Sequence, residues 1–406
     1  MVVTVILSAL ALISLGLLLW QFGAALRFPL HARVAEKSFA PAITLLKPLK
    51  NFDEHTAACL RSWLTQKYDG PVQMLFGVAD QDDPACFIVR ELLKEFPSHD
   101  AELIVAAESL GANAKVSTLV QLFRRAKHEL ICVSDADVGV PQDFLANAVA
   151  PLRDTGAGLV NCFYSLAHPT TLAMHLEAIA VNADFWSQVL QSNTLKRQDF
   201  ALGAVMITRR ELLKKIGAFE SLLDFLADDY QLGNQIARTG ARIELSPLVV
   251  ECRDKPMNFC DVWKHQLRWA RTIRVSQPVP YFFSVLSHTM LWVTLLALFG
   301  NLGGFPLVSD SLLYSGALTP GLQRVLAPLH VPWVLVIFLA VLTARVFIVA
   351  ELQQRLTRTP RASRWWLVFT KDVLGVAVWA MAFMGNNIEW RGGKFRLNRG
   401  GRLVPL

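Results

Sequence analysis

The chain has 406 residues, of which 53% are hydrophobic and 18% are charged, and its mean hydropathy is +0.36. This composition is too apolar for an ordinary soluble protein and too charged for a pure membrane bundle, so it favours a soluble domain attached to a membrane. The net charge of +7 does not indicate a nucleic-acid partner, because most Lys and Arg residues lie beside apolar runs, where they can face anionic lipid head groups.

The first predicted element is a membrane anchor within residues 1–25. Residues 2–20 carry no charge and have about the length needed to cross a hydrocarbon core of roughly 30 Å. The basic residues and the cleavage site of a secretory signal peptide are both missing. Because Arg27, Arg33 and Lys37 follow the anchor, the positive-inside rule predicts that the next domain is cytoplasmic.

Residues 40–255 show the alternation of an α/β domain. The predicted strands are 42–49, 72–80, 102–107 and 129–137, and the predicted helices between them are 53–66, 84–96 and 114–127. Strand and helix in alternation imply a mainly parallel, Rossmann-like sheet with right-handed crossovers. Such sheets bind ligands at the carboxyl ends of their strands.

Two of these strands end in aspartate, which points to a ligand site. In "VSDADV", Asp135 and Asp137 are alternate residues of an extended segment, so both can aim at one Mg²⁺ or Mn²⁺ whose other ligands are diphosphate oxygens and water. Asp80 can accept hydrogen bonds from a uracil or a ribose. The alternatives are a solvated turn for the pair and, near Asp80, capping of the next helix by Asp82 and Asp83.

Three further charged residues lie at predicted helix starts. Lys115 can reach a phosphate, although an exposed helix lysine is the simpler interpretation. Asp228 and Asp229 precede a helix that Gly240 ends, and two acids at this position commonly complement the helix dipole. A hydroxyl that attacks a sugar, however, needs a carboxylate base, and Asp229 can supply it.

An amphipathic basic helix is predicted over residues 256–278. Its segment "WKHQLRWARTIR" carries Trp263 and Trp269 among cations, as membrane-surface helices do. Arg268 can nevertheless turn back to neutralise a diphosphate.

The remaining residues, 279–406, form a predicted membrane region. Residues 281–304 and 332–350 are predicted spans, and Arg345 in the second must snorkel or face protein. Residues 365–384 are interrupted by charge and too short for a full span, so we expect a re-entrant or interfacial segment. The basic tail "EWRGGKFRLNRGGRL" then stays on the cytoplasmic side.

Taken in order, Asp80, Asp135-Ala-Asp137, Asp229 in "ADDY" and the sequence "HQLRW" resemble the D, D, D, (Q/R)-x-x-R-W series of inverting family 2-type glycosyltransferases with a GT-A fold. The chain is most similar to the ceramide glucosyltransferase family, along nearly its whole length, including "LLKPLKNFD", "DQDDPA" and "WRGGKFRLNRGG". The resemblance implies that Asp80 binds the uracil of a UDP-sugar.

The resemblance assigns further roles to the other matching positions. It implies that Asp135 and Asp137 bind a metal ion and the diphosphate, and that Asp229 is the base. Arg268 and Trp269 match the last motif, whereas His265 replaces its Q/R position and can still donate to a phosphate or line the acceptor tunnel.

The predicted function is transfer of glucose from UDP-glucose to the primary hydroxyl of a membrane lipid, first of all ceramide, in the bacterial inner membrane. A hopanoid polyol that receives N-acetylglucosamine is the alternative, because bacterial hopanoid glycosyltransferases carry a similar "LADDY" and "RWxRTIR" pattern. A processive polysaccharide synthase usually has more spans, and a non-catalytic scaffold usually loses the acids that are present here. We expect residues 182–186 and 200–204 to shape the sugar and lipid pocket.

Overall fold

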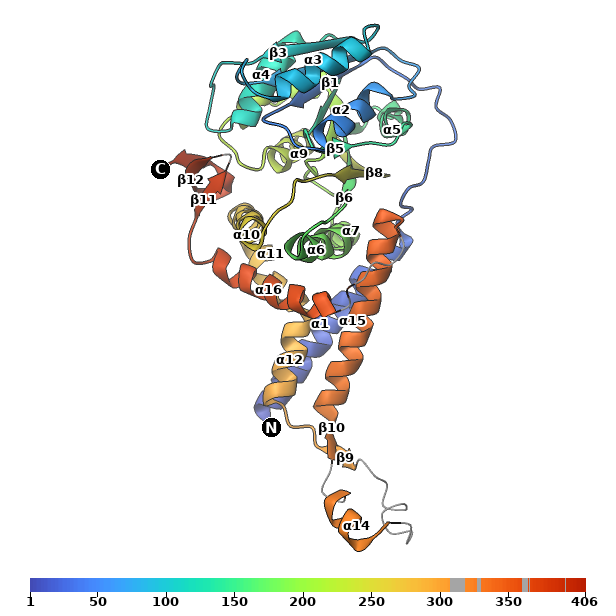
Figure 1. Ribbon diagram of the computed structural model, residues 1–406, viewed down its shortest axis with the longest axis vertical. Coiled ribbons are helices and arrows are strands. Elements are labelled where there is room, and N and C mark those ends of the chain that lie inside the picture. Colours follow the sequence, from blue (N-terminus) through green and yellow to red (C-terminus); the bar gives the residue numbers. More distant parts are fainter. Residues whose placement is uncertain (307–317, 327–329, 360–363, 365, 391) are drawn as a thin grey trace.

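The computed structural model describes residues 1–306, 318–326, 330–359, 364, 366–390 and 392–406. An α/β domain forms one end of the molecule, and a group of apolar helices extends from the other (Figure 1). The fold therefore has the two parts that the composition predicts.

An eight-stranded mixed sheet, in the order β3-β2-β1-β4-β7-β6-β8-β5, forms the centre of the α/β domain. Its strands are β1 (Ile43–Pro48), β2 (Val72–Val78), β3 (Asp100–Val105), β4 (Leu130–Ser134), β5 (Val138–Gly139), β6 (Ala157–Leu166), β7 (Val205–Arg209) and β8 (Arg242–Cys252). The first four strands are parallel, as predicted, and β7 runs antiparallel to both β4 and β6.

Eight α-helices, α2 to α9, lie between these strands in the chain, and α10 follows the last strand. They are α2 (Thr56–Leu64), α3 (Ala85–Glu95), α4 (Ala114–Arg125), α5 (Phe144–Ala148), α6 (Leu172–Ile179), α7 (Trp186–Leu195), α8 (Arg210–Lys215), α9 (Asp228–Arg238) and α10 (Phe259–Ser276). Side-chain caps are present at the N-termini of two of these helices. The Asn113 side chain accepts from Val116 N at the start of α4, and Asn258 forms a capping box with Asp261 at the start of α10.

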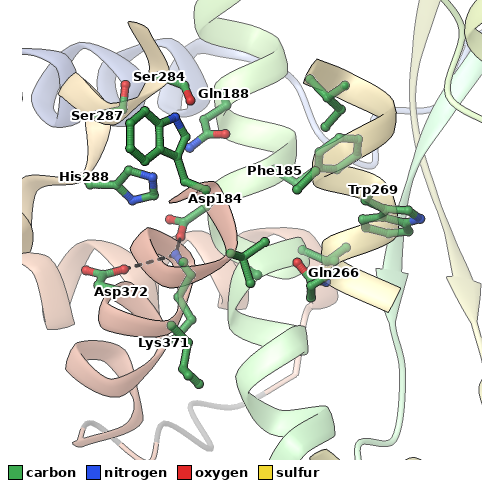
Figure 2. A pocket seen from close by; sticks show the side chains of 18 of the residues that line it. Asp184, Phe185, Gln188, Gln266, Trp269, Ser284, Ser287, His288, Lys371 and Asp372 are labelled. Atoms are coloured by element: carbon green, nitrogen blue, oxygen red, sulfur yellow. Dashed lines mark hydrogen bonds and ion pairs between the residues drawn. The ribbon is translucent and has the colours of Figure 1, made fainter. Parts of the chain in front are cut away.

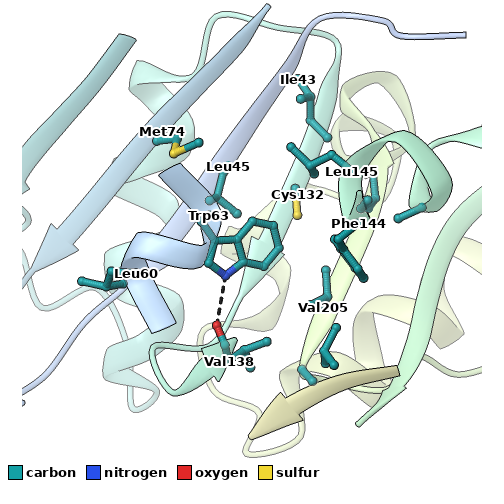
Figure 3. Close-up of a cluster of buried hydrophobic side chains, with 14 of the residues drawn as sticks. Ile43, Leu45, Leu60, Trp63, Met74, Cys132, Val138, Phe144, Leu145 and Val205 are labelled. Atoms are coloured by element: carbon teal, nitrogen blue, oxygen red, sulfur yellow. Dashed lines mark hydrogen bonds between the residues drawn. The ribbon is translucent and has the colours of Figure 1, made fainter. Parts of the chain in front are cut away.

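The core beside α2 fixes the loop that follows β4. Trp63 of α2 is fully buried and packs edge-on against Phe144, with ring centroids 5.6 Å apart. Its indole Nε1 donates to the backbone oxygen of Val138 over 3.0 Å (Figure 3). A buried aromatic side chain with a satisfied polar atom thus holds the segment that carries the Asp-Ala-Asp motif.

A π-helical turn, Ala180–Phe185, joins α6 to α7. Such turns insert extra backbone into a helix and change the direction of the side chains that follow. At this turn, Gln21 Nε2 of the N-terminal helix donates to the backbone oxygen of Asp184 over 3.3 Å and to Ser187 Oγ over 2.6 Å. The α/β domain is therefore bonded directly to the membrane anchor.

Among the described residues, two helices, α1 (Val2–Arg27) and α15 (Trp333–Thr357), are each long and apolar enough to cross a membrane. Over the predicted span 281–304 the chain is bent, and its two helical parts are long and apolar enough for a span only when they are taken together. The chain there forms α11 (Pro278–Phe283), a 3₁₀ turn (Ser284–Ser287) and α12 (Thr289–Phe299), with a bend of 53°. Polar residues at the bend explain the break, because Ser284, Ser287 and His288 line an internal cavity instead of facing lipid.

Arg345 of α15 faces protein, which is one of the two outcomes that the sequence allows. It pairs with Asp184 at 2.8 Å and with Asp372 at 2.9 Å. Asp372 belongs to α16 (Trp366–Ala382), which lies across the direction of α1 and α15 beneath the α/β domain (Figure 1). The charges in this segment thus neutralise one another inside the protein.

The tail folds as a small antiparallel sheet of β11 (Asn387–Trp390), β12 (Gly393–Leu397) and β13 (Leu403–Pro405). Leu403 N donates to the oxygen of Asp224 over 2.7 Å, and Leu226 N donates to that of Gly401 over 3.1 Å. The tail sheet therefore contacts the segment that leads into α9, on the same side as the α/β domain. Arg391 of the expected basic tail lies outside the described residues.

Between α12 and α15, the described elements are short. They are β9 (Gly304–Pro306), α14 (Pro320–Leu326) and β10 (His330–Pro332), and β9 pairs antiparallel with β10.

Candidate active site

A buried lysine joins two of the predicted acids. Lys115, at the start of α4, places its Nζ 2.7 Å from Asp135 Oδ1 and 3.2 Å from Asp228 Oδ2. Burial lowers the pKa of Lys115, but the charges of the two carboxylates outweigh burial and raise it above its ordinary value. The expectation of an exposed helix lysine is wrong, because both partners come from other parts of the chain. Lys115 links the loop after β4 to α9.

Asp229 has surroundings different from those of its neighbour Asp228. Its carboxylate lies against Gly203, where an added Cβ would come within 2.6 Å of Asp229 Oδ2 and would force the carboxylate to move. Burial and the charge of Asp228 raise the pKa of Asp229 to about 6, against the opposing charge of Lys115. A carboxyl group that titrates near neutral pH is well matched to proton transfer.

Lys47 contacts the Asp-Ala-Asp loop and the end of β4. This residue was missed by the sequence analysis. Lys47 is completely buried at the end of β1, and its Nζ donates to Ser134 Oγ over 3.2 Å and to the backbone oxygen of Asp135. A charged residue inside the apolar run "ITLLKPL" was the signal that could have found it.

Nearby carboxylates act on the Asp137 side chain. Burial and the charges of Asp135 and Asp254 raise its pKa to about 7, although Lys47 opposes the rise. Asp254, which follows β8, was also missed by the sequence analysis. The charges of Asp135 and Asp254 both act against ionisation of Asp137, so a cation bound beside Asp137 would relieve this repulsion.

The donor set at this loop fits a divalent metal ion that is shared with a ligand. Among the residues that the structure describes, no three His, Cys, Asp or Glu side chains are arranged as a complete metal site. One or two carboxylates suffice for Mg²⁺ or Mn²⁺ when diphosphate oxygens and water supply the remaining ligands. Asp135 and Asp137 can supply these two.

Asp80 lies just beyond β2, at the same sheet edge as the end of β4, because β1 pairs with both strands in parallel. Its carboxylate is exposed and accepts from Asp82 N over 3.0 Å. Asp83, by contrast, accepts from Ala85 N and from Asn51 N and so serves the start of α3. Asp80 therefore remains available to a ligand.

Helix α10 brings His265, Arg268 and Trp269 to the same region. The ring of His265 packs edge-on against Trp269 at 4.5 Å, and its Nδ1 lies 2.8 Å from Glu177 Oε1. Burial raises the pKa of Asp254, and the charges of His265 and Arg268 oppose this rise. The three residues of the last motif thus lie between the acid cluster and α6. Glu177 was not predicted, since its partners lie far away in the sequence.

A cavity of about 1140 Å³ lies between the α/β domain and the membrane helices. Most of its lining side chains are apolar, while Figure 2 shows a polar group, Asp184, Lys371 and Asp372, on one wall. Residues from both predicted pocket segments reach it, namely Asp184 and Phe185 from the first and Phe200 from the second. The remaining polar wall residues include Gln188, Gln266 and His288, together with Ser284 and Ser287.

An aromatic contact joins the cavity wall to the helix that carries the candidate base. Phe200 of the wall stacks on Tyr230 with ring centroids 6.3 Å apart, and Tyr230 is the direct neighbour of Asp229. Phe185, also of the wall, packs against Trp269 at 6.4 Å. Asp229 itself is not among the residues that line the cavity.

The sequence profile of glycosyl transferase family 21 matches residues 3–309 and 303–403. The chain belongs to glycosyl transferase family 21. The resemblance to ceramide glucosyltransferases is thereby confirmed, and this family 21 chain is a glycosyltransferase.

Among curated relatives, the family 21 chain is 26% identical to ceramide glucosyltransferase 3 of Caenorhabditis elegans over 223 residues, which is 54% of this chain and 48% of the relative. It is 27% identical to the ceramide glucosyltransferase of Candida albicans over 175 residues, 40% of this chain and 30% of the relative. The chain thus spans about half or less of the length of these curated relatives.

A solved structure agrees with the fold of this family 21 glycosyltransferase. Mannosyltransferase PcManGT from Pyrobaculum calidifontis, determined in complex with GDP-Man and Mn²⁺, superposes with a TM-score of 0.53 at 20% identity. The match covers 94% of this chain and 99% of that one. The predicted GT-A fold with membrane helices is confirmed.

Proposed function

We propose that this family 21 glycosyltransferase moves glucose from UDP-glucose to the primary hydroxyl of ceramide, with inversion at the anomeric carbon. The observation that carries the proposal is the position of Asp229. Its carboxyl group, with a pKa of about 6, is adjacent in the chain to Asp228, which Lys115 links to Asp135, and to Tyr230, on which Phe200 of the cavity wall stacks. The names of the curated relatives support glucose and ceramide as the substrates.

In the proposed reaction, Asp229 takes the proton of the ceramide hydroxyl while the hydroxyl oxygen attacks the anomeric carbon. The attack comes from the face opposite UDP, so the bond from that carbon to the diphosphate oxygen breaks and its electron pair leaves with UDP. Arg268 stabilises the charge that develops on the diphosphate, and Asp80 accepts hydrogen bonds from the uracil.

We assign a divalent metal ion, Mg²⁺ or Mn²⁺, to Asp135 and Asp137. When bound, the ion neutralises charge on the diphosphate. Lys47 and Lys115 hold the backbone and one carboxylate of this loop in place, so the ligands are already oriented.

The acceptor lipid enters the cavity from the membrane. Helices α1 and α15 anchor the enzyme in the bilayer, and we place the catalytic domain on the cytoplasmic side of a bacterial inner membrane, because Arg27, Arg33 and Lys37 follow the anchor. Positioning both substrates at the membrane surface supplies proximity.

The test is product identification with the full chain in detergent. UDP-glucose is supplied with ceramide, and UDP-N-acetylglucosamine with a hopanoid polyol, in parallel reactions. We expect the mass of glucosylceramide in the first reaction and its loss on metal chelation. A product only in the second reaction contradicts the proposed substrates but keeps the glycosyltransferase assignment.

A further inference from the structure

Glu177 is a carboxylate buried in the wall of the cavity. It lies on α6, is only 2% exposed, and belongs to the cavity lining. Its Oε1 accepts from Gln266 Nε2 over 2.8 Å and lies 2.8 Å from His265 Nδ1. Two residues of α10 therefore fix the orientation of this side chain.

The second oxygen of Glu177 has no matching donor. Within the described part of the chain, Oε2 is buried and has no hydrogen-bond partner. Buried polar atoms in folded proteins are nearly always paired, and an ionised carboxylate can only accept. Because Glu177 is a lining residue, a molecule in the cavity can supply the missing N–H or O–H donor.

This carboxylate lies beside residues of the last motif. His265, whose Nδ1 is 2.8 Å from Glu177 Oε1, packs against Trp269 at 4.5 Å between ring centroids. Trp269 in turn packs against Phe185, another lining residue, at 6.4 Å. Glu177 is therefore part of the cavity wall that α10 and its motif residues help to form.

We propose that Glu177 Oε2 accepts a hydrogen bond from a second donor group of the acceptor lipid, an N–H or O–H close to the hydroxyl that receives the sugar. The inference rests on the proposed function, and it restricts the acceptor to lipids that carry a second hydrogen-bond donor. The enzyme selects amide alcohols and polyols, and it discriminates against lipids with a single hydroxyl.

The test compares two acceptors in the full-length enzyme with UDP-glucose as donor. One acceptor is a short-chain ceramide, and the other is a primary alkanol of matched length, which has no second donor. We expect wild type to prefer ceramide and Glu177→Leu to reduce the ratio of kcat/KM values, ceramide over alkanol, by about 10- to 100-fold. Glu177→Gln should reduce it less, since an amide oxygen still accepts.

Glu211→Leu, an exposed glutamate on α8, is the control and should keep the wild-type ratio. The inference is overturned if Glu177→Gln and Glu177→Leu each lower kcat/KM by the same factor for ceramide and for the alkanol. The proposed function stays intact in that case. If Glu177→Leu does not fold, Glu177→Gln decides by the same ratio. If wild type uses neither acceptor, the proposed function itself fails, and the inference falls with it.

Discussion

Asp228 and Asp229 are adjacent in the sequence, yet their surroundings give them different roles. Asp228 is paired with Lys115 at 3.2 Å, whereas Asp229 lies against Gly203 near the cavity. The pair therefore combines a residue that holds α9 in place with one that is free to take a proton. The sequence motif alone favours Asp229 only through the family resemblance.

We expect Asp229→Asn to lower kcat by about 10²- to 10⁴-fold, because the amide cannot accept the proton of the attacking hydroxyl. UDP-glucose affinity, measured by calorimetry, should stay within a few-fold of wild type. Asp228→Asn is the matched control, with a smaller loss of kcat and a lower melting temperature from the lost ion pair. A rate in Asp229→Asn equal to wild type rules out Asp229 as the base.

The pH dependence should report the same carboxyl group. Asp229 has a pKa raised to about 6, so it is protonated below that pH and cannot act as a base. We expect kcat to fall about tenfold per pH unit below pH 6. Asp228 raises this pKa and Lys115 lowers it, so Asp228→Asn should move the acid limb to lower pH. An acid limb unchanged by that variant contradicts the assignment.

At the level of elements, charged residues fix how α15 and α16 pack beneath the catalytic domain. Arg345 is 5% exposed and pairs with Asp184 and Asp372, while Lys371 also contacts both carboxylates. Removal of one partner from a buried ion pair is strongly destabilising, because the other charge stays buried without compensation.

Removing Arg345 leaves two buried carboxylates with Lys371 as their cation. We expect Arg345→Leu to destabilise the fold by about 3–5 kcal/mol, measured by thermal or chemical unfolding in detergent. Arg355→Leu on the same helix is the control, because its exposed pair with Glu351 is worth about 0–1 kcal/mol. Equal effects of the two changes speak against a structural role for the buried network.

The tail sheet supports α9 from outside the catalytic domain. Besides the two backbone bonds described above, Gln231 Nε2 of α9 donates to the oxygen of Gly400 over 2.9 Å. Removing residues 398–406 should lower kcat by on the order of 10- to 100-fold, because small displacements of a catalytic group are costly. Val404→Ser, an exposed position on β13, should have little effect in the same assay. Full activity of the truncated enzyme contradicts this role.

For the whole molecule, one cysteine reports the orientation in the membrane. Cys260 is exposed, and the other five cysteines, all within the described residues, are buried. A membrane-impermeant maleimide should label Cys260 in inverted inner-membrane vesicles and leave right-side-out vesicles unlabelled. An epitope added after Leu406 should be reached from the same side, since the tail contacts the catalytic domain. Opposite accessibility of the two sites contradicts the proposed topology.

The first half of the catalytic domain could be predicted from local pattern. Apolar runs and helical periodicity alternate there, and the structure confirms β1 to β4 with α2 to α4 between them. The antiparallel pairing of β7 with β4 and β6 depends on contacts far apart in the chain, which local pattern does not encode.

The same distinction applies to the site. The acids at strand and helix ends were visible as motifs, whereas the burial of Lys115 depends on Asp228, 113 residues later. In the sequence "LAMHLEAI", no local feature distinguishes Glu177 from an ordinary residue of an apolar helix. Its partners lie on α10, which is distant in the sequence. Sequence motifs identify residues with candidate chemical roles, whereas the fold shows which charged side chains are in contact.

The π-helical turn over Ala180–Phe185 has a consequence for how this enzyme can diverge. A single-residue deletion within it would tighten the wide turn to a regular α-helix and remove one residue from a stretch that includes the cavity-lining Asp184 and Phe185. That change would reshape the cavity wall while leaving Glu177 and the acids of the sheet edge in place. Insertions and deletions at this turn are therefore a simple route by which related enzymes could acquire different lipid acceptors without altering their sugar-transfer chemistry.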